Sequence, residues 1–146
     1  MADYESLTAL IIEFYEKISA WEQEKVRDAA LTVPQMHILE ILGHHSDPRD
    51  PMRMTDVAGK MGVTSGTLTV GIDRLEKQGL VQRSSHPVDR RSVVVVLTEA
   101  GQRMFAEHHQ HHLALTEALC AQLSPEEQVS LERVLRCFNE MSLPGA

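Results

Sequence analysis

The sequence lacks long apolar runs and a secretion signal, and it has only two cysteines. No apolar stretch approaches the ~20 residues that a bilayer span requires, so we expect no membrane partner. The N-terminus carries acidic residues instead of a basic region and has no small-residue cleavage site, which argues against secretion. We therefore expect a cytoplasmic protein in which Cys120 and Cys137 act as small apolar groups rather than as a redox switch.

Sequence motifs for catalysis are also missing. There is no glycine-rich phosphate loop and no nucleophile elbow. The alternative of a metal-dependent hydrolase would need an open ligand position and a general base. The H-E-x-x-H pairing that supplies both is absent, so we do not expect an enzyme.

The net charge of −7 taken alone argues against nucleic acid as a partner, because DNA affinity depends on neutralising phosphates. The distribution of this charge along the chain indicates that DNA is a partner. Residues 53–98 contain seven Lys or Arg and four Asp or Glu, a balance of +3, whereas the remainder contains seven and seventeen, a balance of −10. A locally basic segment between acidic arms favours a DNA-binding module.

Helical periodicity surrounds this basic segment. Residues 4–27 carry apolar side chains at spacings of three and four, and a second helix is expected from Thr32-Val33-Pro34 to about Gly43. Residues 44–51 contain two prolines and two aspartates and are expected to form a loop. Two further helices are predicted at about 99–122 and 125–141, and Ser124 with Pro125 is expected to open the second of them.

Residues 55–78 are typical of a helix-turn-helix. Thr55 is expected to cap a short helix that ends at Gly62, and Thr64 is expected to cap a second helix from about Ser65 to Gln78. Small hydroxylated residues at the start of a second helix are suited to contact base edges in the major groove. The candidate DNA-contacting residues on this helix are Thr64, Ser65, Thr67, Thr69 and Arg74.

A β-hairpin is predicted after this helix, because four consecutive valines favour a strand and a turn with Arg90 and Arg91 precedes them. The motif Asp89-Arg90-Arg91, followed after five residues by Leu97-Thr98-Glu99-Ala100-Gly101, resembles the wing signature D-x-R-x5-L-T-x-x-G of the multiple-antibiotic-resistance regulator (MarR) family. The resemblance implies that Arg91 reaches the DNA minor groove and that Asp89 helps to hold the wing.

The resemblance to the MarR family also implies the fold and the assembly. The expected fold is mainly α, with a winged helix-turn-helix at residues 33–98 and dimerisation helices at residues 1–30 and 99–146. DNA would be bound mainly by the segment from Thr55 to Thr98. The implied partners are a second copy of the chain and a pseudo-palindromic double-stranded operator with half-sites about one helical turn apart.

Four of the eight histidines lie at positions 108, 109, 111 and 112. On a helix His108 and His112 face the same way, and Glu107 with His111 forms a second pair. Two imidazoles at this spacing can bind one transition-metal ion, whereas the alternative is a solvated helix face. His44 and His45 beside Asp47 are weaker candidates, and His86 is expected to contact phosphate or solvent.

The histidine pattern resembles the zinc-responsive branch of the MarR family, which represses zinc-uptake genes. The resemblance implies a primary site formed by Glu22 or Glu24, His37, His108 and His112. A further site in that branch uses a Cys that this chain lacks and a Glu that Met36 replaces here, so Glu107 and His111 are only possible additional ligands.

Three imidazoles and one carboxylate suit Zn²⁺, although Ni²⁺ and Co²⁺ would also fit. A metal that joins helices one, two and five would raise DNA affinity, so we expect a repressor that is active when metal is plentiful. The alternative is a repressor that a small apolar or phenolic ligand releases from DNA.

Overall fold

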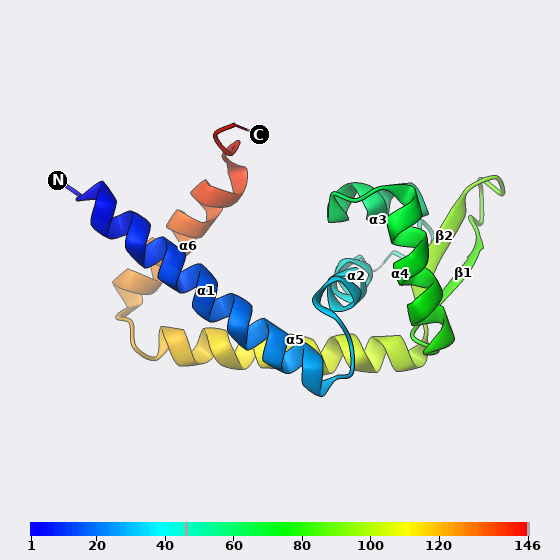
Figure 1. Cartoon of the computed structure of the whole chain (residues 1–146), viewed down its shortest axis with the longest axis horizontal. Coiled ribbons are helices and arrows are strands. Elements are labelled where there is room, and N and C mark those ends of the chain that lie inside the picture. The colour runs from blue at the N-terminus through cyan, green and yellow to red at the C-terminus, as the bar shows by residue number, and fades with distance from the viewer. Residues whose placement is uncertain (46, 146) are drawn as a thin grey trace. The chain divides into compact units, whose positions relative to one another are not determined.

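A computed structural model describes residues 1–45 and 47–145, and the fold is mainly helical with one β-hairpin (Figure 1). The prediction of a winged helix-turn-helix is confirmed in the order and the type of the elements. These elements are α1 (Tyr4–Asp28), α2 (Val33–His44), α3 (Met54–Met61), α4 (Ser65–Lys77), β1 (Val81–Ser85), β2 (Val93–Leu97), α5 (Glu99–Cys120) and α6 (Pro125–Glu140).

The chain divides into two compact units, Met1–His108 and His109–Ala146. The first unit contains α1 to α4, the hairpin and the first half of α5. The second contains the rest of α5 and the whole of α6. Within the described residues, no helix combines the length and the apolar character that a membrane span requires.

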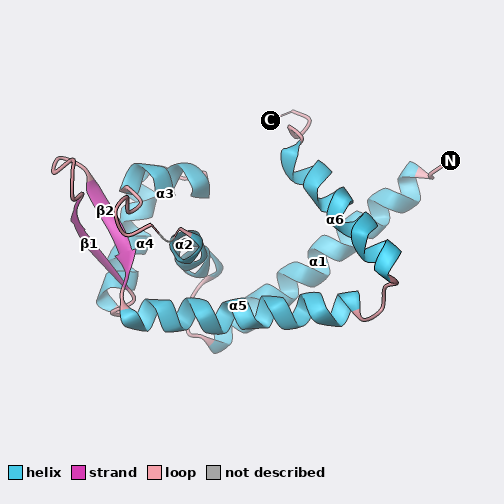
Figure 2. Cartoon of the chain, turned by 180° about the vertical axis from the view of Figure 1, so that it is seen from behind, coloured by secondary structure: helices cyan, strands magenta, loops and turns pink. Residues whose placement is uncertain are grey.

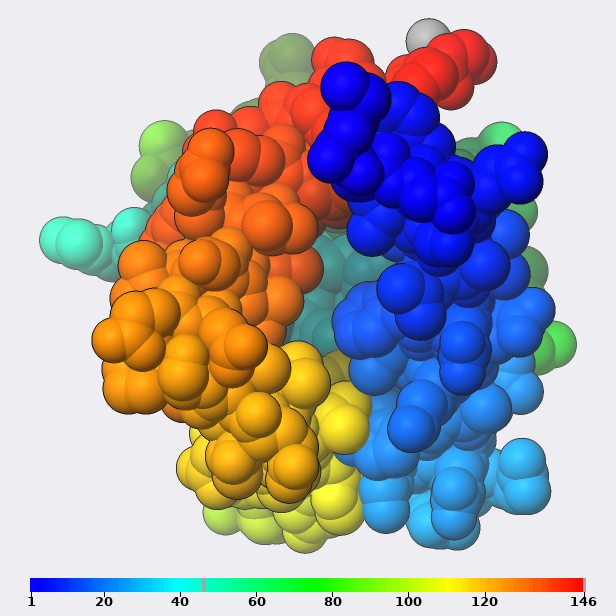
Figure 3. Space-filling model, turned by 90° about the vertical axis from the view of Figure 1, so that its left-hand side faces the viewer, coloured from blue at the N-terminus to red at the C-terminus, as the bar shows by residue number. Residues whose placement is uncertain are grey.

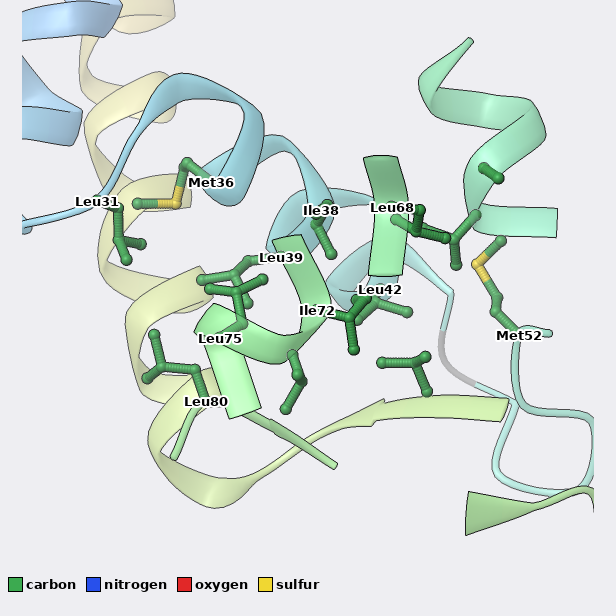
Figure 4. Close-up of a cluster of buried hydrophobic side chains, with 14 of the residues drawn as sticks. Leu31, Met36, Ile38, Leu39, Leu42, Met52, Leu68, Ile72, Leu75 and Leu80 are labelled. Atoms are coloured by element: carbon green, nitrogen blue, oxygen red, sulfur yellow. The ribbon is translucent and has the colours of Figure 1, made fainter. Parts of the chain in front are cut away.

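The core of the first unit lies between α2 and α4. Met36 and Leu39 of α2 and Ile72 and Leu75 of α4 have no exposed surface, and Figure 4 shows them within one cluster of buried side chains. Full burial of such a side chain stabilises the fold by roughly 1.5–3 kcal/mol. This packing fixes the orientation of α4 on α2.

Local caps set the helix boundaries, and three of them follow the sequence pattern. Thr32, Thr64 and Ser124 each accept a hydrogen bond from the backbone N–H three residues later. The prediction that Thr55 caps α3 is wrong, because this helix begins at Met54. The carboxylate of Asp56 accepts from the backbone N–H of Arg53 at 3.3 Å, and Arg53 occupies the cap position two residues before Thr55.

Strands β1 and β2 form an antiparallel hairpin, with Val81 opposite Leu97 at one end and Ser85 opposite Val93 at the other (Figure 2). Residues 52–53 extend this hairpin on the β2 side. Arg53 forms an isolated bridge with Val94, and the N–H of Val95 donates to the carbonyl of Met52 at 3.0 Å. The base of the wing is therefore attached to the chain that leads into α3.

The start of α5 is fixed against the end of α4 and the hairpin. The N–H of Thr98 donates to the carbonyl oxygen of Leu80 at 3.1 Å, and the hydroxyl of Thr98 donates to the carbonyl oxygen of Gly79. A Cβ at Gly101 would collide with that same Leu80 carbonyl. These contacts explain physically why threonine and glycine occur in the L-T-x-x-G part of the wing signature.

The terminal helices carry exposed apolar side chains. In the N-terminal half of α1, the dark blue helix of Figure 3, these include Leu10, Ile11 and Phe14. In α6 no residue is buried, and Val134 and Phe138 are more than half exposed. Each helix therefore presents an apolar surface that a monomer leaves in contact with water.

Candidate functional site

Helix α4 presents one side to the core and the opposite side to solvent. Leu68, Ile72 and Leu75 form the buried side. The opposite side is exposed, and the helical repeat places Val70 at its centre. We define the reading face as Thr67, Val70, Arg74 and Lys77, all of which are exposed.

The predicted DNA-contacting hydroxyls of α4 divide into two groups. Thr64 caps the helix and donates to the hydroxyl oxygen of Thr67 at 3.1 Å, and the half-buried Thr69 donates to the carbonyl of Ser65 at 2.8 Å. The side chains of Thr64 and Thr69 thus already serve the helix itself. Ser65, Thr67 and Arg74 are exposed, so the structure leaves them accessible to a ligand.

Val70 was not identified from the sequence, although it is 51% exposed on the reading face. An apolar side chain there is able to contact the C5-methyl group of thymine in a major groove. The signal that could have identified it is its position, because the helical repeat turns Val70 away from Leu68 and Ile72.

Arg83 of β1 has a structural role and is not part of the exposed positive charge of the module. Its guanidinium donates to Asp73 at 2.6 Å and to Glu76 at 3.0 Å, and both carboxylates are on α4. The side-chain hydrogen bond from Arg83 holds the pKa of Glu76 below its ordinary value. Arg83 is one of the seven basic residues of segment 53–98, and it joins the hairpin to α4.

The wing tip, residues 87–92, is organised around Asp89. Its carboxylate accepts from the hydroxyl of Ser92 at 2.7 Å and from the backbone N–H of Arg91 at 3.3 Å. The hydrogen bond from Ser92 is the main reason why the pKa of Asp89 is lowered. Asp89 thus holds the turn while Arg90 and Arg91 remain exposed to solvent.

The prediction that His86 contacts phosphate or solvent is wrong. His86 is 4% exposed, and its Nε2 lies 3.0 Å from a carboxylate oxygen of Asp50. Asp50 precedes α3, so this contact joins the wing to a segment 36 residues away in the sequence. The periodicity of the hairpin gives no sign of this burial, because His86 lies just outside β1.

A cluster of potential metal ligands lies where α1, α2 and α5 meet in the first unit. Nε2 of His108 is 2.8 Å from a carboxylate oxygen of Glu22 and 3.2 Å from one of Glu40. The His108 side chain is only 2% exposed, whereas the side chains of Glu22 and Glu40 are 17% and 27% exposed. The ligand atoms of these three residues all lie within 4.8 Å of one another.

This arrangement selects among the predicted ligands. It brings Glu22 and His108 together, whereas Glu24 is exposed and lies outside the cluster. His37 is also exposed, and Glu40 is the α2 residue that faces His108. Glu40 follows the buried Met36 by four residues and shares its side of α2, whereas His37 is turned by about 100° from Met36.

The other candidate ligands are His112, Glu107, His111 and His45. His112 follows His108 by four residues in α5, and its role as a ligand stays a prediction from this spacing. Glu107 and His111 are exposed, and they are not in the cluster. In the loop after α2, Nε2 of His45 donates to the carbonyl of Asp50 at 2.7 Å.

Known proteins with similar sequences support the fold described above. The sequence model of the MarR family matches residues 31–93. The chain is 41% identical over 99 residues to the uncharacterized HTH-type transcriptional regulator YfiV of Bacillus subtilis, covering 67% of this chain and 59% of YfiV. It is 31% identical over 111 residues to the transcriptional regulator AdcR of Streptococcus pneumoniae, covering 74% and 73% of the two chains.

The fold is similar to the crystal structure of Streptococcus pneumoniae FabT in complex with DNA, with a TM-score of 0.84 and 23% identity. The similarity covers 94% of this chain and 96% of FabT. The chain belongs to the MarR family of winged-helix transcription regulators. Family membership agrees with the expectation of a regulator rather than an enzyme.

Proposed function

We propose that this protein is a cytoplasmic, homodimeric repressor whose affinity for a pseudo-palindromic DNA operator increases when Zn²⁺ binds. Family membership, the reading face of α4 and the exposed Arg90 and Arg91 support DNA binding. The similarity to FabT, whose structure contains DNA, supports the same conclusion. The exposed apolar residues of α1 and α6 support a homodimer.

One observation carries the proposal of metal control: a buried imidazole faces two carboxylates from two other helices. Zinc–ligand bonds of ~2.0–2.1 Å in a tetrahedral site place the ligand atoms ~3.3 Å apart. The separations of 2.8 and 3.2 Å from His108 to Glu22 and Glu40 are close to this value. The residues therefore fit a zinc ion without a large rearrangement.

The donor set also fits the charge of the metal. The carboxylates of Glu22 and Glu40 together neutralise a divalent cation, which matters because a buried net charge is costly. The imidazole of His108 would bind through Nε2, the atom that faces both carboxylates. Two carboxylates make the site harder than the three-histidine site expected from the sequence, so Mn²⁺ joins Ni²⁺ and Co²⁺ as a competitor.

A metal in this position would act through α2 on α4, the helix that carries the reading face. It would join α1, α2 and α5, and α2 packs against α4 within one hydrophobic core. The bound metal would thus restrict the orientation of the reading face. By linkage, metal binding then raises DNA affinity by the same factor as DNA binding raises metal affinity.

The alternative is release from DNA by a small apolar or phenolic ligand, and a cleft in the first unit favours it. This cleft has a volume of about 300 Å³ and is lined by residues that include Leu42, Met52, Val95 and Leu97. Its volume is at the lower end for sites that enclose a small molecule. Metal dependence of DNA binding separates the two functions.

The test measures metal content and DNA affinity on one preparation. The protein first selects a duplex from a pool of random-sequence DNA, and its affinity for that duplex is then measured with zinc and with chelator. We expect roughly one zinc per chain and a 5- to 150-fold higher affinity with zinc, the usual range of allosteric coupling. Equal affinity in both states would contradict metal control while leaving DNA binding established.

A further inference from the structure

The wing carries an internal contact that the proposed function does not use. His86 lies immediately before the wing tip, residues 87–92, and it is almost completely buried. A buried histidine in a solvent-facing hairpin needs partners for both ring nitrogens, because an unpaired buried polar atom is costly. Both nitrogens of His86 have partners, and these partners belong to two different segments.

One nitrogen holds the tip itself. Nδ1 of His86 lies 3.1 Å from the backbone nitrogens of both Val88 and Asp89. A backbone N–H can only donate, so Nδ1 must accept and cannot carry a hydrogen. The hydrogen that the ring donates is therefore on Nε2.

The other nitrogen holds the wing to the rest of the unit. Nε2 of His86 donates to the carboxylate of Asp50 at 3.0 Å. Asp50 is itself held, because its backbone carbonyl accepts from His45 and its N–H donates to the carbonyl of Asp47 at 3.2 Å. The hydrogen bond from His86 is the main reason why the pKa of Asp50 is lowered.

We propose that His86 and Asp50 form a latch that places the wing tip for DNA, which makes His86 a positioning residue for Arg90 and Arg91. The latch and the hydrogen bond from Arg53 to Ser92 at 3.3 Å both join this end of the hairpin to the segment that leads into α3. This inference rests on the proposed DNA binding. Its energetic effect is that the tip is ordered before DNA arrives, so binding does not have to order it.

Two variants break the latch in different ways. Asp50→Ala removes the acceptor from an exposed position, where the side chain of Asp50 is 63% accessible, so the fold should be preserved. His86→Asn keeps an oxygen that can accept from the N–H groups of Val88 and Asp89, but it is too short to reach Asp50. Asp47→Ala is the matched control, because it removes the same charge from the same loop without touching His86.

The first readout is affinity for the selected duplex. We expect both latch variants to bind about 3- to 10-fold more weakly, the loss of one hydrogen bond, while Asp47→Ala binds at least as well as the wild type. In a background that carries both Arg90→Ala and Arg91→Ala the additional loss should disappear, because the latch acts through these two side chains of the tip. A purely structural role would give the same loss in both backgrounds, and this result would overturn the proposal.

The second readout needs no DNA. Trypsin cleaves after Arg90 and Arg91, and mass spectrometry measures the rate at this site in the intact protein. Asp50→Ala should speed this cleavage by about 3- to 10-fold relative to Asp47→Ala, because the released tip fits the protease more often. Equal rates would overturn the latch. If the wild type selects no duplex, the proposed function fails, and the trypsin rates still decide the latch.

Discussion

Nε2 of His108 on α5 lies 2.8 Å from a carboxylate oxygen of Glu22 on α1, although 86 residues separate the two in the sequence. Glu40 of α2 completes the contact from a third helix. A metal at this point would reinforce a junction that the fold has already formed. The roles of these three residues can therefore be tested without rebuilding the site.

Glu22 and Glu24 provide a matched pair. Glu22→Gln should lower zinc affinity at least ~10-fold, because an amide is a weaker ligand than a carboxylate and second-shell losses alone cost ~10–100-fold. Glu24→Gln should leave the affinity unchanged, since Glu24 is exposed outside the cluster. Competition with a fluorescent zinc indicator measures both affinities. Equal losses in the two variants would show that proximity to His108 does not define the ligand.

Variants of Glu40 and His37 distinguish the ligands that the structure brings together from those expected from the sequence. Glu40→Gln should weaken zinc binding by at least ~10-fold, whereas His37→Ala should have little effect, because a carboxylate oxygen of Glu40 lies 3.2 Å from His108 and His37 is exposed. Isothermal titration with Zn²⁺ measures both variants. A large loss in His37→Ala with none in Glu40→Gln would restore the histidine to the site.

Arg91→Ala should weaken binding to the selected duplex by ~1–3 kcal/mol, the range for one specific contact with a base pair. The wing tip is exposed, so the stability of the protein should not change. Arg49→Ala is the control, because it removes the same charge from an exposed arginine that pairs with Asp47. Fluorescence anisotropy at fixed salt gives both affinities, and equal losses would mean that only the net charge matters.

Val70 is expected to recognise a thymine. Replacement of successive thymines by deoxyuridine in the selected duplex removes one C5-methyl group at a time, and one such position should weaken wild-type binding about 3- to 10-fold. Val70→Ala should lose this preference while keeping its affinity for random DNA. If the variant distinguishes the two duplexes as well as the wild type does, Val70 does not contact the base.

The contact between Arg83 and Glu76 predicts a dependence of stability on pH. Because the folded protein lowers the pKa of Glu76, the contact stabilises the fold above the unfolded value of ~4.3, and this stabilisation is lost as the pH falls through the folded value. Urea unfolding between pH 3 and 7 should therefore show a shallower acid dependence for Glu76→Gln. Glu99→Gln, which removes an exposed carboxylate paired with Arg103, is the control and should keep the wild-type dependence.

The sequence predicted most of the features that depend on near neighbours. Thr32, Thr64 and Ser124 were identified as caps because the hydroxyl and the N–H that it accepts from are three residues apart. The wing was identified from its valines and arginines. Periodicity therefore suffices where the partner is local.

The features that were missed depend on how one segment packs against another. Glu22 and Glu24 are equivalent in sequence, and only the rotation of α1 against α5 separates them. The same holds for Glu40 and His37 on α2. The burial of His86 depends on Asp50, which a local pattern cannot relate to the hairpin.

The close approach of Gly101 to the carbonyl of Leu80 has a consequence for how variation in this chain is interpreted. Alanine is normally the mildest replacement in a helix, and glycine is the costly residue. At the start of α5 this order is reversed, because the added methyl group must enter space that the carbonyl already occupies. A tolerance map of α5 would therefore show an intolerant position where helix-propensity scales predict a gain in stability. Replacing Gly101 by alanine to strengthen this helix would instead separate it from the wing.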